Sequence, residues 1–178
     1  MVLVGDEEAV MRVEPALSNE QEKELLRKCW YAHDARWFRS VAEEFGLEAA
    51  NRVNKRACRA LGEAEMRSFM KALGITPPTT VQELVPAIEA TFSLFTPPPL
   101  MDLEVRVVDD RSWEGWMKRC FIHDNVVKAG IGPSYVCAAI DRIWGWHDAL
   151  GLPLADKPPA FRCPKLEGRD CRHVLTIR

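Results

Sequence analysis

The period of the hydrophobic pattern changes once along this chain, at the three consecutive prolines 97–99. Before the prolines, apolar residues recur every three or four positions, as in amphipathic helices. After them, Leu103, Val105 and Val107 alternate with charged residues, which is the period of a half-buried strand. The sequence therefore predicts an α+β fold, in which an N-terminal helical hairpin or bundle precedes a small, mostly antiparallel sheet packed on one or more helices.

Three helices are predicted before the prolines. The first begins at a capping box formed by Ser18 and Gln21, and it ends at Gly46. The second covers about 47–73, and the third covers about 80–94 and opens with another capping box. These helices make up the first half of the chain.

The second half is predicted to contain a strand pair whose return strand is Trp116–Ile122, a helix at 133–150 and a terminal strand. In "CRHVLTIR" the side chains of Cys171, His173, Leu175 and Ile177 share one face of that strand.

The chain is therefore divided into a flexible segment (1–17), a helical lobe (18–96) and an α+β lobe (100–178) that carries most of the cysteines and histidines. At 178 residues the two lobes are expected to form one compact domain.

Composition excludes several classes of protein. The formal net charge is -2 with acids and bases interleaved, so there is no basic stripe for nucleic acid. No apolar run approaches the ~20 residues of a membrane helix, and the N-terminus lacks a basic leader. We therefore expect a cytoplasmic protein with no membrane partner. In a reducing compartment the six cysteines point to packing, metal binding or chemistry rather than disulfides.

The motif order within residues 101–178 carries one family resemblance. A strand pair leads to Cys120, a predicted helix bears Cys137 and Asp141, and "CPKLEGRDC" leads into the last strand. This order resembles bacterial L-2-amino-thiazoline-4-carboxylate hydrolase-like proteins. The closing C-x4-G-x2-C pattern is also similar to 4-vinyl reductase-type small-molecule-binding domains. The resemblance implies either hydrolysis of a small cyclic amidine or amide C–N bond, or binding of a small organic acid or heterocycle without turnover.

Candidate catalytic residues are Cys137, Asp141 and a histidine. Four positions apart on a helix, Cys137 and Asp141 would lie on one face. A nearby carboxylate disfavours a thiolate, so a base such as His123 or His173 is required, with Asp141 orienting it or activating water. The alternative interpretation places Cys137 in the core and Asp141 in a surface ion pair.

A metal site is predicted near the C-terminus. Cys163, Cys171 and His173 fall within eleven residues, and Cys120 or His123 would supply a fourth ligand. Zinc suits this sulfur and nitrogen set. Packing of buried cysteines and a reactive thiol are the two alternatives.

A ligand pocket is predicted in the helical lobe. His33 and Asp34 lie between Trp30 and Trp37 on the apolar stripe of the first helix, and Asn54 is placed on the inner face of the second. These polar groups would form either the floor of a tryptophan-lined pocket or a hydrogen-bonded link between two helices.

The loop "KAGIGPS" is a second candidate for ligand binding. Gly132 lies just ahead of the predicted helix at 133–150, where backbone amides can hold a carboxylate, although such a loop is more often only a turn. The six tryptophans suit a core, a pocket or a subunit interface, so a homodimer is an open alternative.

Overall fold

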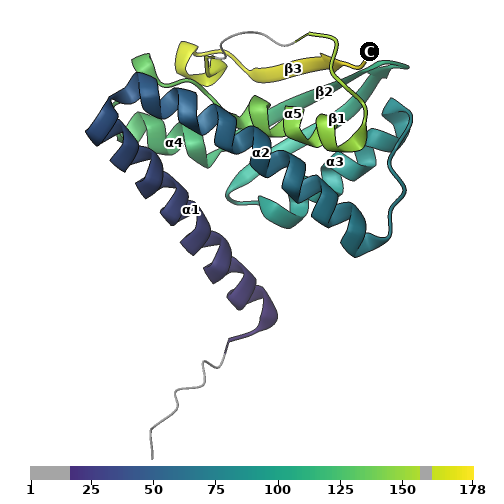
Figure 1. Ribbon diagram of the computed structural model, residues 1–178, viewed down its shortest axis with the longest axis horizontal. Coiled ribbons are helices and arrows are strands. Elements are labelled where there is room, and N and C mark those ends of the chain that lie inside the picture. The colour runs from purple at the N-terminus through teal and green to yellow at the C-terminus, as the bar shows by residue number, and fades with distance from the viewer. Residues whose placement is uncertain (1–16, 157–161) are drawn as a thin grey trace, which may run out of the picture. The chain divides into compact units, whose positions relative to one another are not determined.

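The computed structural model describes residues 17–156 and 162–178 and has an α+β fold, in which three helices precede a three-stranded antiparallel sheet and two more lie between its second and third strands (Figure 1). The chain falls into two compact units, residues 1–35 and 36–178, which are described separately. The described elements, in chain order, are α1 (Asn19–Phe45), α2 (Leu47–Leu73), α3 (Val81–Phe95), β1 (Met101–Asp109), β2 (Ser112–Cys120), α4 (Phe121–Lys128), α5 (Ala139–Leu150) and β3 (Cys171–Thr176).

The first unit, as far as it is described, consists of the beginning of α1. The predicted capping box is confirmed: the Ser18 N–H donates to Gln21 Oε1 at 2.9 Å, and the Gln21 N–H donates to Ser18 Oγ at 3.3 Å. Apart from Leu17, the segment predicted to be flexible lies outside the described residues.

Within the second unit, local signals end α2 and begin α3 where the sequence predicts. Gly74 terminates α2 in the left-handed conformation at φ 63°. The hydroxyl of Thr80 accepts the Glu83 N–H at 3.2 Å. The Glu83 carboxylate, however, bonds to Thr79 rather than to Thr80, so the expected reciprocal box is displaced by one residue.

Helix α2 packs on α5 through two glycines (Figure 1). A Cβ atom built on Gly62 would lie 2.1 Å from the Arg142 carbonyl oxygen, and one built on Gly145 would lie 2.1 Å from that of Arg59. Only glycine permits this approach. One hydrophobic core then joins α2 and α3 of the predicted helical lobe to the sheet and α5, through residues that include Met66, Phe69, Leu84, Ile88, Trp113, Trp144, Trp146 and Ile177.

The sheet has the order β1-β2-β3, with both pairs antiparallel. Its inner face carries the fully buried Trp113, whose indole N–H donates to His147 Nε2 at 3.2 Å. Alternate residues of β3 are less exposed, so Cys171, His173 and Leu175 share one face as predicted.

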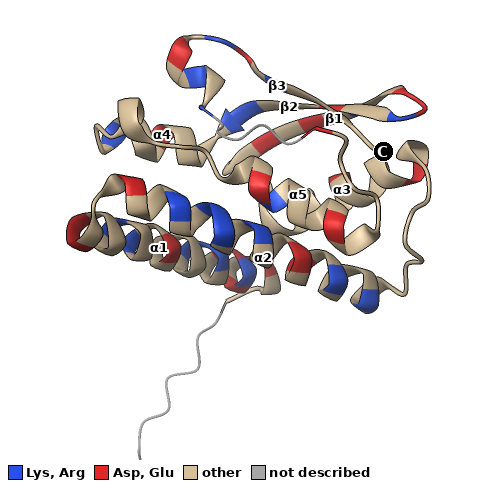
Figure 2. Cartoon of the chain, turned by 45° about the horizontal axis from the view of Figure 1, so that its top comes forward, with Lys and Arg blue, Asp and Glu red and all other residues tan. Residues whose placement is uncertain are grey.

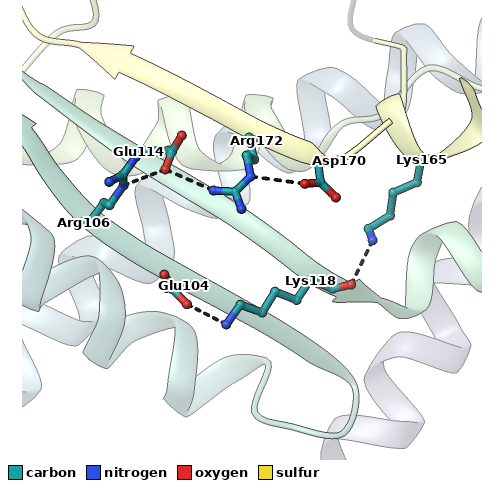
Figure 3. A network of polar contacts seen from close by, with 7 residues as sticks. All are labelled: Glu104, Arg106, Glu114, Lys118, Lys165, Asp170 and Arg172. Carbon is teal, nitrogen blue, oxygen red and sulfur yellow. Dashed lines mark hydrogen bonds and ion pairs between the residues drawn. The ribbon is translucent and has the colours of Figure 1, made fainter. Parts of the chain in front are cut away.

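The opposite face of the sheet carries a network of ion pairs (Figure 3). Arg172 lies 3.6 Å from the ring centre of Trp116, its register partner on β2. The same arginine reaches Glu114 at 3.5 Å and Asp170 at 3.3 Å. Lys118 pairs with Glu104 at 2.6 Å. These charges have protein partners on the surface of the sheet.

Two element predictions are wrong in detail. The return strand was placed at Trp116–Ile122, but β2 ends at Cys120 and α4 follows at once. The helix placed at 133–150 begins only at Ala139, after a 3-10 turn at Gly132–Ser134. The reason is a tertiary contact: the side-chain oxygen of Asn51 accepts the Val136 N–H at 3.1 Å, which fixes this stretch outside the helix.

Candidate functional site

Three cysteines, one histidine and one tyrosine meet around a small buried space, which we call the thiol cavity. Its lining comes from the end of β2, from α4, from residues 135–137 and from the turn before β3: Cys120, Ile122, His123, Val126, Tyr135, Cys137, Cys163 and Leu166. The volume is about 10 Å³, close to that of a single water molecule. The cavity coincides with a second hydrophobic cluster, separate from the main core.

Local structure places the cavity residues. Cys120 is the N-cap of α4, and the nearby backbone N–H groups of His123 and Ile122 oppose part of the rise in the pKa of its thiol. His123 and Val126, three positions apart on α4, then face the same side. Cys163 immediately precedes the 3-10 turn Pro164–Glu167, which contacts α4.

Burial raises the pKa of three groups that line the thiol cavity. Loss of solvent is the main cause that raises the pKa of the Cys120 thiol, and it raises the pKa of Cys137 further. The neighbouring thiols act in the same direction, and the pKa of the Tyr135 hydroxyl is raised for the same two reasons. At neutral pH Cys120, Cys137 and Tyr135 are therefore protonated, and Cys120 and Cys137 are poor thiolate nucleophiles.

The histidine of the cavity makes only a long contact with a thiol. His123 Nδ1 lies 3.9 Å from Cys163 Sγ, and the imidazole is half-buried. His123 and Cys137 both line the thiol cavity. Their joint role in catalysis stays a prediction.

Cys171 and His173 lie together on β3, with Sγ 3.5 Å from Nε2. Burial raises the pKa of Cys171 to about 11. Burial and, secondarily, Arg169 lower the pKa of His173. Across residues 17–156 and 162–178 no three histidines, cysteines or acids form a group that could hold a metal ion. Zinc binding by this pair with Cys163 and Cys120 therefore stays a prediction.

The predicted pairing of Cys137 with Asp141 on one helix face is wrong. Cys137 precedes α5 and lines the thiol cavity, whereas Asp141 lies in the first turn of α5 and lines a different pocket. Burial raises the pKa of Asp141, while Lys55, 3.9 Å away, opposes that shift. The two side chains enter different pockets because α5 begins only at Ala139, after the Val136 N–H has been bound by the Asn51 side chain.

The second pocket is an open groove of about 600 Å³, which we call the basic groove. Four bases on α2 line it with two acids, one asparagine and one valine: Glu48, Asn51, Arg52, Lys55, Arg56, Arg59, Val136 and Asp141. Val136 lies between Tyr135 and Cys137, so residues 135–137 separate the basic groove from the thiol cavity.

Asn51 was missed by the sequence analysis, which placed Asn54 on the inner face instead. Asn51 is buried and binds the backbone of Ser134 and Val136. Asn54 is half-buried, and its side-chain oxygen accepts from the Cys58 thiol at 3.5 Å. Gly62 is the sequence signal that could have identified Asn51. A glycine inside a helix often marks a face that another segment approaches closely, and Asn51 lies on the same face of the second helix as Gly62.

The predicted buried stripe of α1 is wrong. His33, Asp34 and Trp37 are exposed, with Trp37 at 63%, and α1 contains no buried residue. Trp30 stacks on Tyr31 with ring centres 5.2 Å apart. Because His33 and Asp34 are exposed, burial does not demand a hydrogen-bonded link to Asn54. A ligand role for these residues stays a prediction.

The loop at Gly132 lies next to the thiol cavity. It begins the 3-10 turn that leads into residues 135–137, and a Cβ there would lie 3.3 Å from Leu166 of the thiol cavity. Helix α5 begins at Ala139, so Gly132 does not lie at its N-terminus. The carboxylate site predicted at that helix N-terminus is therefore not formed by Gly132 and α5.

A family model described as a family of unknown function, DUF6125, matches residues 16–142. The chain belongs to this family. The DUF6125 match includes every residue of the basic groove and three of the four segments of the thiol cavity, but it ends before Cys163 and β3. No match is found among curated proteins.

One solved structure is similar in fold. It is described as a trafficking protein particle complex subunit 3 from Naegleria fowleri covalently bound to palmitic acid. The match has a TM-score of 0.60 at 13% identity, and it covers 90% of this chain and 97% of that chain. At this identity the likeness concerns the fold alone. No described helix of our chain is both long and apolar enough to span a bilayer.

Proposed function

We propose that this member of DUF6125 is a small-molecule-binding module that works without turnover, and that the thiol cavity receives an apolar part of the ligand. The observation that carries the proposal is the convergence of three thiols on one buried apolar space, where burial raises the pKa of two of them, Cys120 and Cys137. Four separate segments are needed to build it. Uncharged thiols suit binding of an apolar group better than nucleophilic attack.

The cavity is small, so binding requires one wall to move. Leu166 is the natural candidate, because it is only half-buried and lies in the short turn after Cys163. We propose a fatty acyl chain as the first ligand class to test, because the similar structure is described as carrying palmitic acid. The proposal includes a cytoplasmic location, where all six cysteines, each of them free among the described residues, stay reduced.

The test is to fill the thiol cavity with a larger side chain on α4. Val126 lines the cavity and is 5% exposed, whereas its neighbour Val127 is 55% exposed. Titration calorimetry with palmitic acid is expected to show binding to the wild-type protein and to Val127→Trp, and none to Val126→Trp. Val126→Leu, a milder filling, is measured beside it, with circular dichroism to verify folding.

Equal binding by Val126→Trp and wild type would contradict the proposed cavity. Absence of palmitic acid binding by the wild type would remove the acyl class. Small organic acids and heterocycles, the ligands implied by the family resemblance, would then be titrated in the same way. Sedimentation of the same samples tests whether the protein is a homodimer.

A hydrolase of small cyclic amidines is a second candidate, which one observation favours. Asp141 combines a pKa raised by burial with a position in the basic groove, whose volume accommodates a small heterocycle. Asp141→Asn is expected to abolish hydrolysis of L-2-amino-thiazoline-4-carboxylate in a product assay. Lack of turnover by the wild type would eliminate this candidate.

A further inference from the structure

The bases of the basic groove lie on one face of α2. Arg52, Lys55, Arg56 and Arg59 are spaced by three, one and three residues, which is the repeat of a single helical face. Figure 2 shows basic residues recurring along α2. Like charges one turn apart destabilise a helix, so this arrangement has a cost that a bound anion would offset.

Two of the four bases have acidic partners. Arg59 donates to Asp148 at 2.8 Å, and Lys55 lies 3.9 Å from Asp141. Arg52 and Arg56 are exposed, and the side chain of neither has a hydrogen bond or an ion pair within the described part of the chain. Glu48, the other acid of the groove, likewise forms no ion pair there.

Three other arginines of the second unit have acidic partners. Arg142 makes two bonds to the buried Glu65, at 2.6 and 2.7 Å. On the sheet, Arg106 and Arg172 share Glu114 (Figure 3). Arg52 and Arg56 differ from these three arginines in having no acidic partner among the described residues.

The groove also has a fixed wall. Val136 forms part of it, and the backbone around Val136 is held to α2 by both polar atoms of the Asn51 side chain. Arg52 is one residue from Asn51, so the bases and the wall belong to one connected piece of structure. A ligand therefore meets a partly preorganised surface rather than isolated side chains.

We propose that the basic groove binds a phosphate group, with Arg52 and Arg56 as its principal contacts. Guanidinium groups match phosphate oxygens with paired N–H donors, and two of them one turn apart can hold a single phosphate group from two sides. Lys55 and Arg59 add positive charge at the same face. This site is distinct from the thiol cavity and does not rest on the function proposed for it.

The experiment uses two probes that share the phosphate group but differ in source. Inorganic pyrophosphate is titrated by calorimetry, and phosphatidylcholine vesicles with and without phosphatidic acid are tested by flotation. Binding of pyrophosphate would support a soluble phosphate ligand, and binding only to phosphatidic acid vesicles would support a lipid headgroup. Arg52→Gln/Arg56→Gln is expected to weaken whichever binding occurs at least about tenfold.

The matched control removes two charges from the same helix outside the groove. Arg67 and Lys71 are exposed residues of α2, and Arg67→Gln/Lys71→Gln changes the net charge by the same amount. This control is expected to bind within about twofold of wild type. If both double variants lost binding affinity equally, net charge alone would explain the effect, and the proposal would be overturned. Absence of binding to both probes by the wild-type protein would overturn it as well.

Discussion

Asn51 and Val136 are joined by a hydrogen bond of 3.1 Å between the asparagine side-chain oxygen and the valine N–H. The amide nitrogen of Asn51 completes the contact by donating to the Ser134 carbonyl at 2.7 Å. One buried side chain on α2 therefore both donates to and accepts from the backbone of the segment that separates the basic groove from the thiol cavity, and it holds that segment in place.

Removal of the Asn51 amide should destabilise the fold. Asn51→Ala removes the partner of the Ser134 carbonyl and of the Val136 N–H, and because both bonds are only part-buried the expected cost is about 1–3 kcal/mol of unfolding free energy in total. Urea denaturation measures the loss. Asn54→Ala, which removes only a half-buried contact with Cys58, serves as the control and should change stability by less than about 1 kcal/mol. Similar effects of the two variants would contradict the assigned role.

The close approach of α2 and α5 predicts that a Gly→Ala substitution at the contact lowers stability, the opposite of its usual effect inside a helix. Inside a helix Gly→Ala normally stabilises by roughly 0.5–1 kcal/mol. At Gly145 the new Cβ would lie 2.1 Å from the backbone oxygen of Arg59, so the helices must separate and stability must fall. Thermal unfolding of Gly145→Ala tests this. Ala60→Gly, at an exposed position of α2, gives the loss expected from helix propensity alone, about 1 kcal/mol. A stabilised Gly145→Ala variant would show that the close approach is absent.

The buried pair of Glu65 and Arg142 should be costly to break from one side. Glu65 is 6% exposed and also accepts the Trp146 indole N–H at 3.2 Å. Arg142→Met leaves that carboxylate without its cation, which is expected to cost about 3–5 kcal/mol. Glu65→Gln/Arg142→Met should recover part of the loss, because the buried charge is gone. Denaturant titrations of both variants decide this, and a double variant no better than the single one would contradict the explanation.

Thiol reactivity should follow burial. Cys29 is exposed, whereas Cys137 is buried and has a raised pKa. At neutral pH, N-ethylmaleimide is expected to modify Cys29 first and Cys137 only after unfolding. Mass spectrometry of peptides over time gives the order. Rapid modification of Cys137 in the folded protein would mean that the thiol cavity opens readily, and it would weaken the assignment of neutral, enclosed thiols.

The lowered pKa of His173 predicts a loss of stability in acid. Burial keeps this imidazole neutral in the fold, while in the unfolded chain it gains a proton near its ordinary pKa of 6.5. Its contribution is therefore present above pH 6.5 and is lost as pH falls through the lower folded value. Urea midpoints of wild type and His173→Asn, compared from about pH 8 to pH 5, should diverge in that direction. The exposed His33→Asn should run parallel to wild type, and a parallel His173→Asn would refute the prediction.

The local signals of the sequence were sufficient for most of the elements. The capping residues Ser18 and Thr80 and the terminating Gly74 act within one turn of their own helix, so their effect is readable without the fold. The alternation in β3 is equally local. By contrast, the late start of α5 depends on a hydrogen bond between Asn51 and Val136, which are 85 residues apart, and no local pattern encodes that contact.

The sequence by itself determined the α+β order of the chain and the residue types available for chemistry, including Cys120, His123, Cys137 and Cys163. Only the tertiary structure decided how these were grouped. It placed Cys137 with Cys163 in the thiol cavity and Asp141 with the bases of α2 in the basic groove. The physical reason is that composition and periodicity fix which face of each element is apolar. The close approach of α2 and α5 at Gly62 and Gly145 fixes which faces meet.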